Sequence, residues 1–428
     1  MRVYFDTIGC RLNQSEIELL ARQFRAAGYS IAETAAEADV VVINTCTVTS
    51  AAASDSRQKI RQAARAGGAS IAVTGCWATL EPEAARRLPN VTWVIPNAEK
   101  HHLTSTVLGV PTEEFDLEPL ARQPLPGLHQ RTRAFIKVQD GCDNFCTFCI
   151  TRLARGKGHS QSIGQVITEV RAAVDGGARE VVLSGVHLGS WGKDFSPPLH
   201  LRHLIEAILL DTDVERVRLS SLEPWDLDDA FFRLWENPRM CRHLHLPLQS
   251  GSAATLKRMV RKTTPAAYAR LLDSARSNCP EMAITTDIIV GFPGESESEF
   301  EESLAFVNQM NFAGGHVFSY SVREGTAAAR MKSHIHGTVI RRRNARMREV
   351  LRQSSLIYRQ RFIGEVASVL WESCDELGVQ GWRLHGLTDH YIRVEAWSSQ
   401  PLWNQISRVR LEQTTEDGMQ AVILNLSG

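Results

Sequence analysis

Three cysteines stand close together near the middle of the sequence, directly after a short apolar run. Residues 138–156 read VQDGCDNFCTFCITRLARG, which places Cys142, Cys146 and Cys149 at the spacing C-x3-C-x2-C. A four-iron cluster normally takes four thiolates, and this loop supplies three. A structural zinc site would need a fourth Cys or His and usually C-x2-C pairs, which the loop does not offer. The loop therefore predicts a [4Fe-4S] cluster with one iron open to another ligand.

The residues that follow alternate between short apolar runs and helical patterns. The runs AFIKVQ, REVVLSG, VERVRLSS, HLHLPLQ, AITTDIIVG and GHVFSYS predict six strands with helices between them. Six strand–helix units over residues 132–361 are typical of a parallel, partial (β/α)6 barrel, smaller than the eight-stranded one. The cysteine loop follows the first of these strands, on the face where such sheets carry their chemistry.

A second alternation of strands and helices fills residues 1–110. Its runs RVYFDTIG, ADVVVINT, ASIAVTG and VTWVI are rich in Val and Ile, as buried parallel strands are, and predict an open α/β sheet. Three of these strands end at a cysteine: Cys10, Cys46 and Cys76. Strand ends of a parallel sheet meet at one edge, so the three thiols predict a second three-cysteine cluster site. The alternative is that they are small buried apolar residues, as we expect for the unpatterned Cys241, Cys279 and Cys374.

The rest of the chain has a different texture. Residues 111–131 are rich in proline with little periodicity, which predicts a linker. From residue 362 to 428 the short runs VASVLWES, GWRLHG, YIRVEAW, SRVRLEQ and AVILNL predict a small all-β barrel of the oligonucleotide-binding type. The predicted fold class is thus α/β, with an open sheet domain, a partial barrel and a C-terminal β-barrel.

Charge and hydropathy indicate the cellular compartment but not the function. Lys plus Arg equal Asp plus Glu at 48 each, so net charge indicates no partner. We expect a cytoplasmic protein without a membrane partner, because no basic-then-apolar leader and no spanning stretch is visible. Nine cysteines in a reducing compartment favour metal ligation over disulfides.

The cysteine loop resembles that of the radical S-adenosylmethionine (radical SAM) superfamily, which has the same spacing. The resemblance implies that the open iron binds S-adenosylmethionine and that its cleavage gives a 5′-deoxyadenosyl radical. It also implies cofactor contacts along successive strand ends, at Gly185, His187, Ser220, Ser221, Glu223, Gln249, Ser250, Gly291 and Pro293. Arg155 and Gly156 match the segment that follows the loop in this family, whereas Gln161 stands where the family commonly has Arg.

The pairing of both cysteine sets with a C-terminal barrel is similar to the methylthiotransferases, whose barrel is a TRAM domain. Within them, GCRLNQSE, INTCTVT and SRQKIR resemble the branch that acts on N6-threonylcarbamoyladenosine next to the tRNA anticodon. The resemblance implies two [4Fe-4S] clusters, methylthio insertion at C2, a tRNA anticodon stem-loop as partner, an electron donor such as flavodoxin or ferredoxin, and a sulfur source. The alternatives are the isopentenyladenosine branch, the branch that modifies a ribosomal-protein aspartate, and a non-catalytic RNA-binding sensor.

A basic stretch precedes the C-terminal barrel. Residues 330–361 hold ten Lys or Arg side chains and one acid, Glu349. Such a stripe fits phosphate contacts, and its alternative is a solvated helix face. In the barrel, Trp382, His385, Tyr391 and Trp397 offer rings on which bases can stack, although such rings are just as often core.

Overall fold

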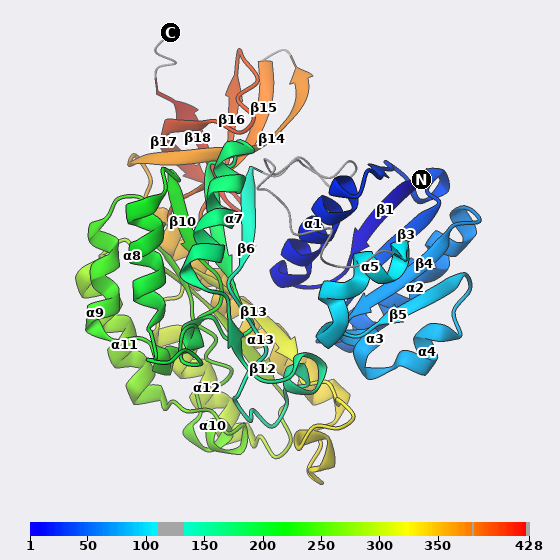
Figure 1. Ribbon diagram of the computed structural model, residues 1–428. Helices are drawn as coiled ribbons and strands as arrows, with labels where there is room; N and C mark the ends of the chain where they lie inside the picture. The colour runs from blue at the N-terminus through cyan, green and yellow to red at the C-terminus, as the bar shows by residue number, and fades with distance from the viewer. Residues whose placement is uncertain (110–131, 379–380, 425–428) are drawn as a thin grey trace.

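The computed structural model describes residues 1–109, 132–378 and 381–424, which form three parts (Figure 1). The first is a parallel sheet flanked by helices, the second an open barrel of six parallel strands, and the third a small closed barrel. This confirms the predicted α/β fold class with its C-terminal β-barrel. The predicted linker, residues 111–131, lies outside the described residues.

The sheet of the first part has the strand order β2-β1-β3-β4-β5 and is parallel throughout. Its strands are β1 (Arg2–Thr7), β2 (Ser30–Ile31), β3 (Val40–Thr45), β4 (Ser70–Gly75) and β5 (Val91–Ile95). Its helices are α1 (Arg11–Ala26), α2 (Ser50–Ala66), α3 (Cys76–Leu80), α4 (Pro82–Arg86) and α5 (Leu103–Leu108). The four strands expected from sequence are all present, and the two-residue β2 is an addition.

Helices cover both faces of this sheet, which explains its nearly continuous apolar runs. On one face, Phe5 of β1 meets Phe24 of α1 edge to face, with ring centroids 5.5 Å apart. On the other face, Ile43 of β3 belongs to the same buried cluster as Ile60 of α2. Each fully buried side chain of this size contributes about 2 kcal/mol to folding.

The second part contains two three-stranded sheets joined into one. The orders β10-β9-β6 and β11-β12-β13 are linked by parallel bridges from Val217 to Met240 and from Ser221 to His245. The six strands are β6 (Arg133–Lys137), β9 (Glu180–Ser184), β10 (Arg216–Leu219), β11 (His243–His245), β12 (Ala283–Val290) and β13 (Gly314–Ser319), and a small pair is β7 (Gln139–Asp140) with β8 (His159–Ser160). The helices are α6 (Thr151–Arg155), α7 (Ile163–Asp175), α8 (Leu201–Asp211), α9 (Asp229–Phe232), α10 (Ala253–Arg258), α11 (Pro265–Asn278), α12 (Glu297–Gln309) and α13 (Gly337–Gln360).

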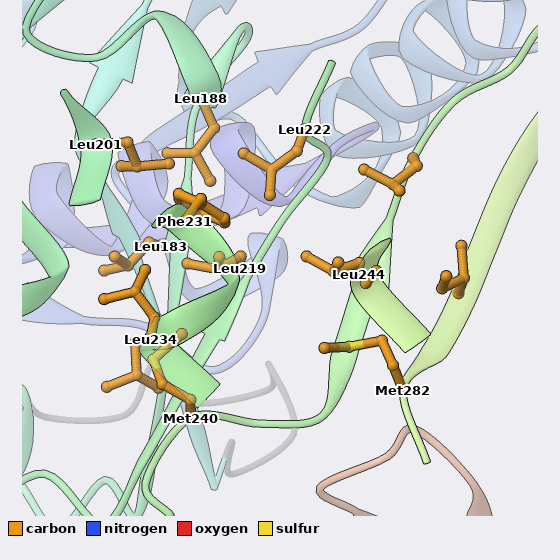
Figure 2. Close-up of a cluster of buried hydrophobic side chains, with 14 of the residues drawn as sticks. Leu183, Leu188, Leu201, Leu219, Leu222, Phe231, Leu234, Met240, Leu244 and Met282 are labelled. Carbon is orange, nitrogen blue, oxygen red and sulfur yellow. The ribbon is translucent and has the colours of Figure 1, made fainter. Parts of the chain in front are cut away.

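The largest buried cluster lies between these strands and their outer helices. Figure 2 shows Leu183, Leu219 and Leu244 from three successive strands, with Phe231 of α9 and Leu201 of α8 beside the first two. All five are at most 1% exposed. This layer holds β9, β10 and β11 side by side, so their carboxyl ends form one rim.

The two edge strands leave the barrel open on one side. At the β6 edge, the N–H of Lys137 donates to Ser15 Oγ of α1 at 3.1 Å, so the first part lies against this edge (Figure 1). At the β13 edge, Asn344 of α13 donates to the carbonyl of Val317 at 3.2 Å. The gap between the two edges is therefore bounded by the first part and by α13.

The small barrel has the closed order β14-β15-β16-β18-β17. Its strands are β14 (Val366–Gly378), β15 (Gly381–Thr388), β16 (Arg393–Ser398), β17 (Ile406–Thr414) and β18 (Met419–Ile423). The fully buried Arg218 of β10 ties it to the larger barrel, since it pairs with Glu180 at 2.6 Å and donates to the carbonyl of Thr388 at 3.1 Å. Burial alone would raise the pKa of Glu180, but Arg218 lowers it to about 2.

One strand is shorter than the sequence predicts. The run HLHLPLQ predicts a strand over 243–249, but β11 ends at His245 because Pro247 cannot donate to a ladder. Among the described residues, no helix is both long enough and apolar enough to cross a bilayer.

The end of β4 gives a test of the packing that positions Cys76. Gly75 has φ +97°, and a Cβ there would overlap the backbone of Thr45, whereas at Gly28, with φ +82°, nothing lies within 4 Å of an added Cβ. We expect Gly28→Ala to lower the free energy of unfolding by about 1 kcal/mol through backbone strain alone. Gly75→Ala should cost about 3 kcal/mol, because overpacking adds to strain. Urea denaturation of the metal-free protein checks this, and equal losses would contradict it.

Candidate active site

The three N-terminal cysteines come together at one edge of the first sheet. Cys10 caps α1 just after β1, Cys46 directly follows β3, and Cys76 opens α3 directly after β4. These three strands are neighbours in the sheet, so their carboxyl ends are adjacent. All three cysteines line the same cavity.

The surroundings of this triad fit an iron–sulfur cluster. A Cβ at Gly9, where φ is +110°, would lie 2.6 Å from Cys46 Sγ, so the glycine lets the two strand ends approach. Burial, and then the neighbouring thiols, raise the pKa of Cys46 to about 11, so the free thiol stays protonated at neutral pH. The thiol would lose that proton on ligating iron, because ligating sulfur is thiolate. An all-sulfur donor set suits a cluster better than a hard cation.

The central loop is folded around its own three sulfurs. The N–H of Asn144 donates to Cys142 Sγ and the N–H of Thr151 donates to Cys149 Sγ, both at 3.4 Å. Such N–H···S bonds stabilise thiolate ligands and tune a cluster. The β7–β8 pair closes the loop at its base.

Cys146 has a cationic neighbour that the sequence did not reveal. Arg261 donates to Cys146 Sγ at 3.8 Å and forms an ion pair with Glu223 at 2.6 Å. Its guanidinium also lies 4.6 Å from the ring centroid of Trp225. Glu223, which is expected to contact the cofactor, is thus held by Arg261, and its contact with the cofactor stays a prediction.

Among the described residues, no group of three His, Cys, Asp or Glu side chains is arranged around a single ion. In a [4Fe-4S] cluster each thiolate binds a different iron, so its ligands need not converge on one ion.

A buried ionic network joins the two cysteine sets. Arg155, six residues after Cys149, donates to Glu16 Oε1 and Asp140 Oδ1, both at 2.9 Å. Lys100 reaches the other oxygen of Glu16 at 2.6 Å, and Lys137 lies 3.3 Å from both carboxylates. Burial opposes every charge here, yet the partners hold the pKa of Glu16 well below, and that of Arg155 well above, its ordinary value.

The same network touches the N-terminal triad. Arg155 donates to Asn13 Oδ1 at 2.7 Å, and that oxygen lies 3.7 Å from Cys10 Sγ. Asn97 donates to Cys76 Sγ at 3.6 Å and to the carbonyl of Ala154 at 2.8 Å. Residues beside the central loop are therefore hydrogen-bonded to groups beside the N-terminal thiols.

A cavity of about 750 Å³ opens between the three parts. Its wall includes the N-terminal thiols, the interior of the six-stranded barrel and the turn after β15, represented here by Cys10, Cys46, Cys76, His243, Asp287 and Tyr391. The central loop contributes Thr151 and Arg155 to the wall, but its cysteines do not line it. The N-terminal triad thus faces the cavity directly, and the loop triad adjoins it.

Three of the nine expected cofactor contacts line this cavity: Gly185, Ser220 and Ser221. Ser220 Oγ is buried without a hydrogen-bond partner, which is an arrangement that a bound ligand resolves. Gly185 packs against Gln139, where a Cβ would lie 2.9 Å from the amide oxygen. These positions fit the cofactor's polar groups at the strand ends, and their contacts stay predictions.

The other expected contacts lie outside the cavity wall. His187 is buried between Asn144 and Asp226, with Nε2 2.5 Å from Asp226 Oδ2, so it braces the cysteine loop. Ser250 Oγ accepts from the N–H of Ser252 at 3.2 Å and serves a turn.

Three more have clear backbone roles in the strand-end turns. Gln249, with φ +72°, accepts the N–H of Ile289 on its carbonyl at 2.8 Å. A Cβ at Gly291 would overlap Ile340 of α13, and Pro293 is buried in the same turn. Their roles in cofactor binding remain predictions.

Four of the ten basic side chains of residues 330–361 form ion pairs within the described part of the chain. Arg342, Arg343 and Arg346 form ion pairs with Glu297 or Glu301 of α12, and Arg352 pairs with Glu349. The count of charges in the sequence covered only residues 330–361, and so it left out the acidic side chains of α12. The structure therefore favours a packed and solvated helix face over a phosphate-binding stripe.

The rings of the small barrel separate into two groups. Trp397 is 39% exposed and Trp382 and His385 are half-buried, so these three remain candidates for base contacts. Tyr391 instead lies flat against His243, with ring centroids 3.9 Å apart, and lines the cavity.

The fold and the cysteine loop define a radical S-adenosylmethionine enzyme with a second set of three thiols. The radical SAM superfamily matches residues 136–307, and the uncharacterized protein family UPF0004 matches residues 2–95. Similar in fold is the radical S-adenosylmethionine methyltransferase TsrM from Kitasatospora setae, with cobalamin and a [4Fe-4S] cluster bound (TM-score 0.57, 15% identity, 77% of each chain covered).

Curated relatives are similar over nearly the whole length. The threonylcarbamoyladenosine tRNA methylthiotransferase MtaB of Bacillus subtilis is 35% identical over 96% of this chain and 93% of its own. The tRNA-2-methylthio-N(6)-dimethylallyladenosine synthase of Maricaulis maris is 31% identical over 98% and 96%. The chain belongs to the radical SAM methylthiotransferase family, whose members use S-adenosylmethionine and [4Fe-4S] clusters.

Iron content tests the assignment of the six cysteines. Anaerobic reconstitution should give about eight irons per chain, and about four when Cys10, Cys46 and Cys76 are all replaced by Ala, because each triad holds one four-iron cluster. The matched change Cys279→Ala should leave about eight. A triple variant that keeps eight irons would contradict the N-terminal site.

The interface network predicts a large stability difference between two arginines. Arg155→Met leaves two buried carboxylates short of a partner and should cost about 3–5 kcal/mol of unfolding free energy. Arg22 pairs with Glu169 across the same interface at 2.9 Å but is partly solvated, so Arg22→Met should cost about 1 kcal/mol or less. Denaturation of the metal-free variants measures both, and similar losses would contradict the proposed weight of Arg155.

Proposed function

We propose that this protein is a tRNA methylthiotransferase that installs a methylthio group at C2 of N6-threonylcarbamoyladenosine beside the anticodon. One observation carries the proposal: a second thiol triad lines a cavity to which all three parts of the chain contribute. Relatives named for threonylcarbamoyladenosine are 33–35% identical over 96–97% of this chain, whereas isopentenyl-type relatives are 31% identical over 98% of it or 34–35% identical over 86%, which favours the threonylcarbamoyl nucleoside. The clusters with S-adenosylmethionine supply the radical and the methylthio group.

The chain's own residues bind the cofactor, orient the target base and exclude water from the site. In this proposal Ser220 and Ser221 bind the cofactor's polar groups at the strand ends. Ser220 Oγ, which is buried without a hydrogen-bond partner, forms a hydrogen bond with one of these groups. The barrel interior excludes water from the reacting carbon, and the target base is turned out of its stack to enter. The exposed face of the small barrel, with Trp397, contacts the stem-loop.

The parts of the chain divide this work. Residues 1–110 carry the auxiliary site, 132–361 the radical site and 362–428 the RNA-binding barrel, with residues 111–131 as a linker. An electron donor of the flavodoxin or ferredoxin class and a separate sulfur source complete the reaction, which takes place in the cytoplasm.

Nucleoside analysis tests the substrate. Mass spectrometry of tRNA from a strain lacking the gene should show loss of 2-methylthio-N6-threonylcarbamoyladenosine and accumulation of its unmodified parent, while isopentenyl-type nucleosides stay unchanged. Loss of the isopentenyl product instead would transfer the assignment to that branch. Unchanged methylthio-nucleosides would contradict a tRNA target and favour the ribosomal-protein aspartate.

A biochemical control separates the enzyme from a cluster-containing sensor. Dithionite-reduced, cluster-loaded protein should convert S-adenosylmethionine to 5′-deoxyadenosine. Absence of that product from loaded protein would favour the non-catalytic reading.

A further inference from the structure

Arg11 is the cation nearest in sequence to the N-terminal thiols, and nothing above assigns it a role. It opens α1 directly after Cys10, is half-buried, and lines the cavity. Its Nη2 donates to the hydroxyl of Tyr391 at 2.9 Å, so the side chain extends from the first part to the small barrel across the cavity. In the described part of the chain, no carboxylate forms an ion pair with it.

The partner of Arg11 is rigidly held, so the guanidinium has a fixed place. The Tyr391 ring stacks on His243 with an interplanar angle of 7°, and Arg218 lies 5.3 Å from the same ring. An arginine has five N–H donors, and the one bond to Tyr391 leaves others free in a fork that matches a carboxylate.

Three other basic side chains of the cavity wall already have partners. Arg155 is committed to Glu16 and Asp140. His245 lies 3.3 Å from Asp287, and Arg359 donates to the carbonyl of Glu416 at 3.1 Å.

Of the three remaining basic groups of the wall, His316 is exposed on β13, and His243 and Arg393 are weaker candidates than Arg11 for binding an anion inside the cavity. His243 is buried, and burial followed by the charge of Arg218 puts its pKa well below the ordinary value, so the ring is neutral. Arg393 is exposed to solvent and better placed for the backbone of a nucleic acid than for a sheltered group.

The proposed substrate carries one negative charge on its modified base. N6-threonylcarbamoyladenosine ends in the free carboxylate of threonine, and its substituent sits on C6. C6 and the acceptor carbon C2 flank the same ring nitrogen, so the substituent lies on the ring edge that must approach the auxiliary site. A cation next to Cys10 is therefore on the correct side of the base.

We propose that Arg11 binds the threonyl carboxylate of the target nucleoside and selects it over uncharged adenosines. This inference rests on the proposed function and adds the residue that reads the substituent. A desolvated arginine–carboxylate contact of this kind changes binding by about tenfold to a hundredfold.

The test compares three anticodon stem-loops on the full-length, anaerobically reconstituted protein. They carry N6-threonylcarbamoyladenosine, its threonine methyl ester, or unmodified adenosine. The wild type should bind the first about tenfold or more tightly than the ester, by fluorescence anisotropy, and methylthiolate it with a correspondingly higher kcat/KM. Arg11→Gln should bind acid and ester equally.

Matched variants separate charge from structure. Arg11→Lys keeps the charge and should retain part of the preference, and Tyr391→Phe removes the anchoring bond but leaves the guanidinium and should retain it too. Arg393→Gln, the same change elsewhere on the wall, should weaken all three stem-loops alike. Because the ester comparison uses wild-type protein, the test survives a variant that fails to fold.

The outcomes distinguish a failure of the role of Arg11 from a failure of the proposed function. If the wild type methylthiolates the first stem-loop but ignores esterification, or if Arg11→Gln keeps the preference, the role of Arg11 is wrong and the function stands. If Arg393→Gln alone removes the preference, that arginine reads the carboxylate. If the wild type modifies no threonylcarbamoyladenosine at all, the proposed function fails.

Discussion

The placement of the two cysteine sets depends on the buried contact of Arg155 with Glu16 and Asp140. Arg155 and Asp140 belong to the cysteine-loop region, and Glu16 belongs to the helix that starts beside Cys10. Removing such charges from water is costly, and the cost is offset only when every charge meets its partners with good geometry. The interface therefore has little freedom to slide, and with it the edge that bears Cys10, Cys46 and Cys76 is fixed against the radical SAM barrel.

That constraint explains why the cavity needs all three parts. The six-stranded barrel is open between β6 and β13, so its interior alone would admit water, which is harmful to radical chemistry. The first part covers the β6 edge, and the small barrel inserts Tyr391 against His243 at the start of β11. The wall that results brings together the N-terminal thiols, the interior of the six-stranded barrel and residues of the small barrel.

The sequence predicted what depends on local periodicity and missed what depends on distant pairs. Apolar runs identified the strands, and the C-x3-C-x2-C spacing identified the central cysteines. Strand ends identified the N-terminal cysteines, because parallel strands end at one edge whatever the intervening sequence. The Arg155–Glu16 contact joins residues 139 apart and leaves no local pattern. For the same reason the basic stretch of α13 left two readings open in the sequence, since the acids that pair with Arg343 and Arg346 lie on α12. Of the cofactor contacts that the resemblance implies, Ser220 lines the cavity, whereas Ser250 and Gly291 lie in turns outside its wall, and their contacts with the cofactor stay predictions.

The charges around the auxiliary site also bear on its chemistry. Glu16 and Asp140 carry two negative charges, and Arg155, Lys100 and Lys137 carry three positive ones, so the network keeps one surplus positive charge. The positive charge of Arg155 interacts with the thiols of Cys10 and Cys76. Burial raises the pKa of Cys10, and the charge of Arg155 opposes that rise. Three thiolates in a low-dielectric recess need such compensation, because an isolated buried anion is strongly unfavourable. The interface that fixes the position of the N-terminal thiols thus also stabilises their ligating form, which is why one arginine can serve both the assembly of the domains and the electrostatics of the site.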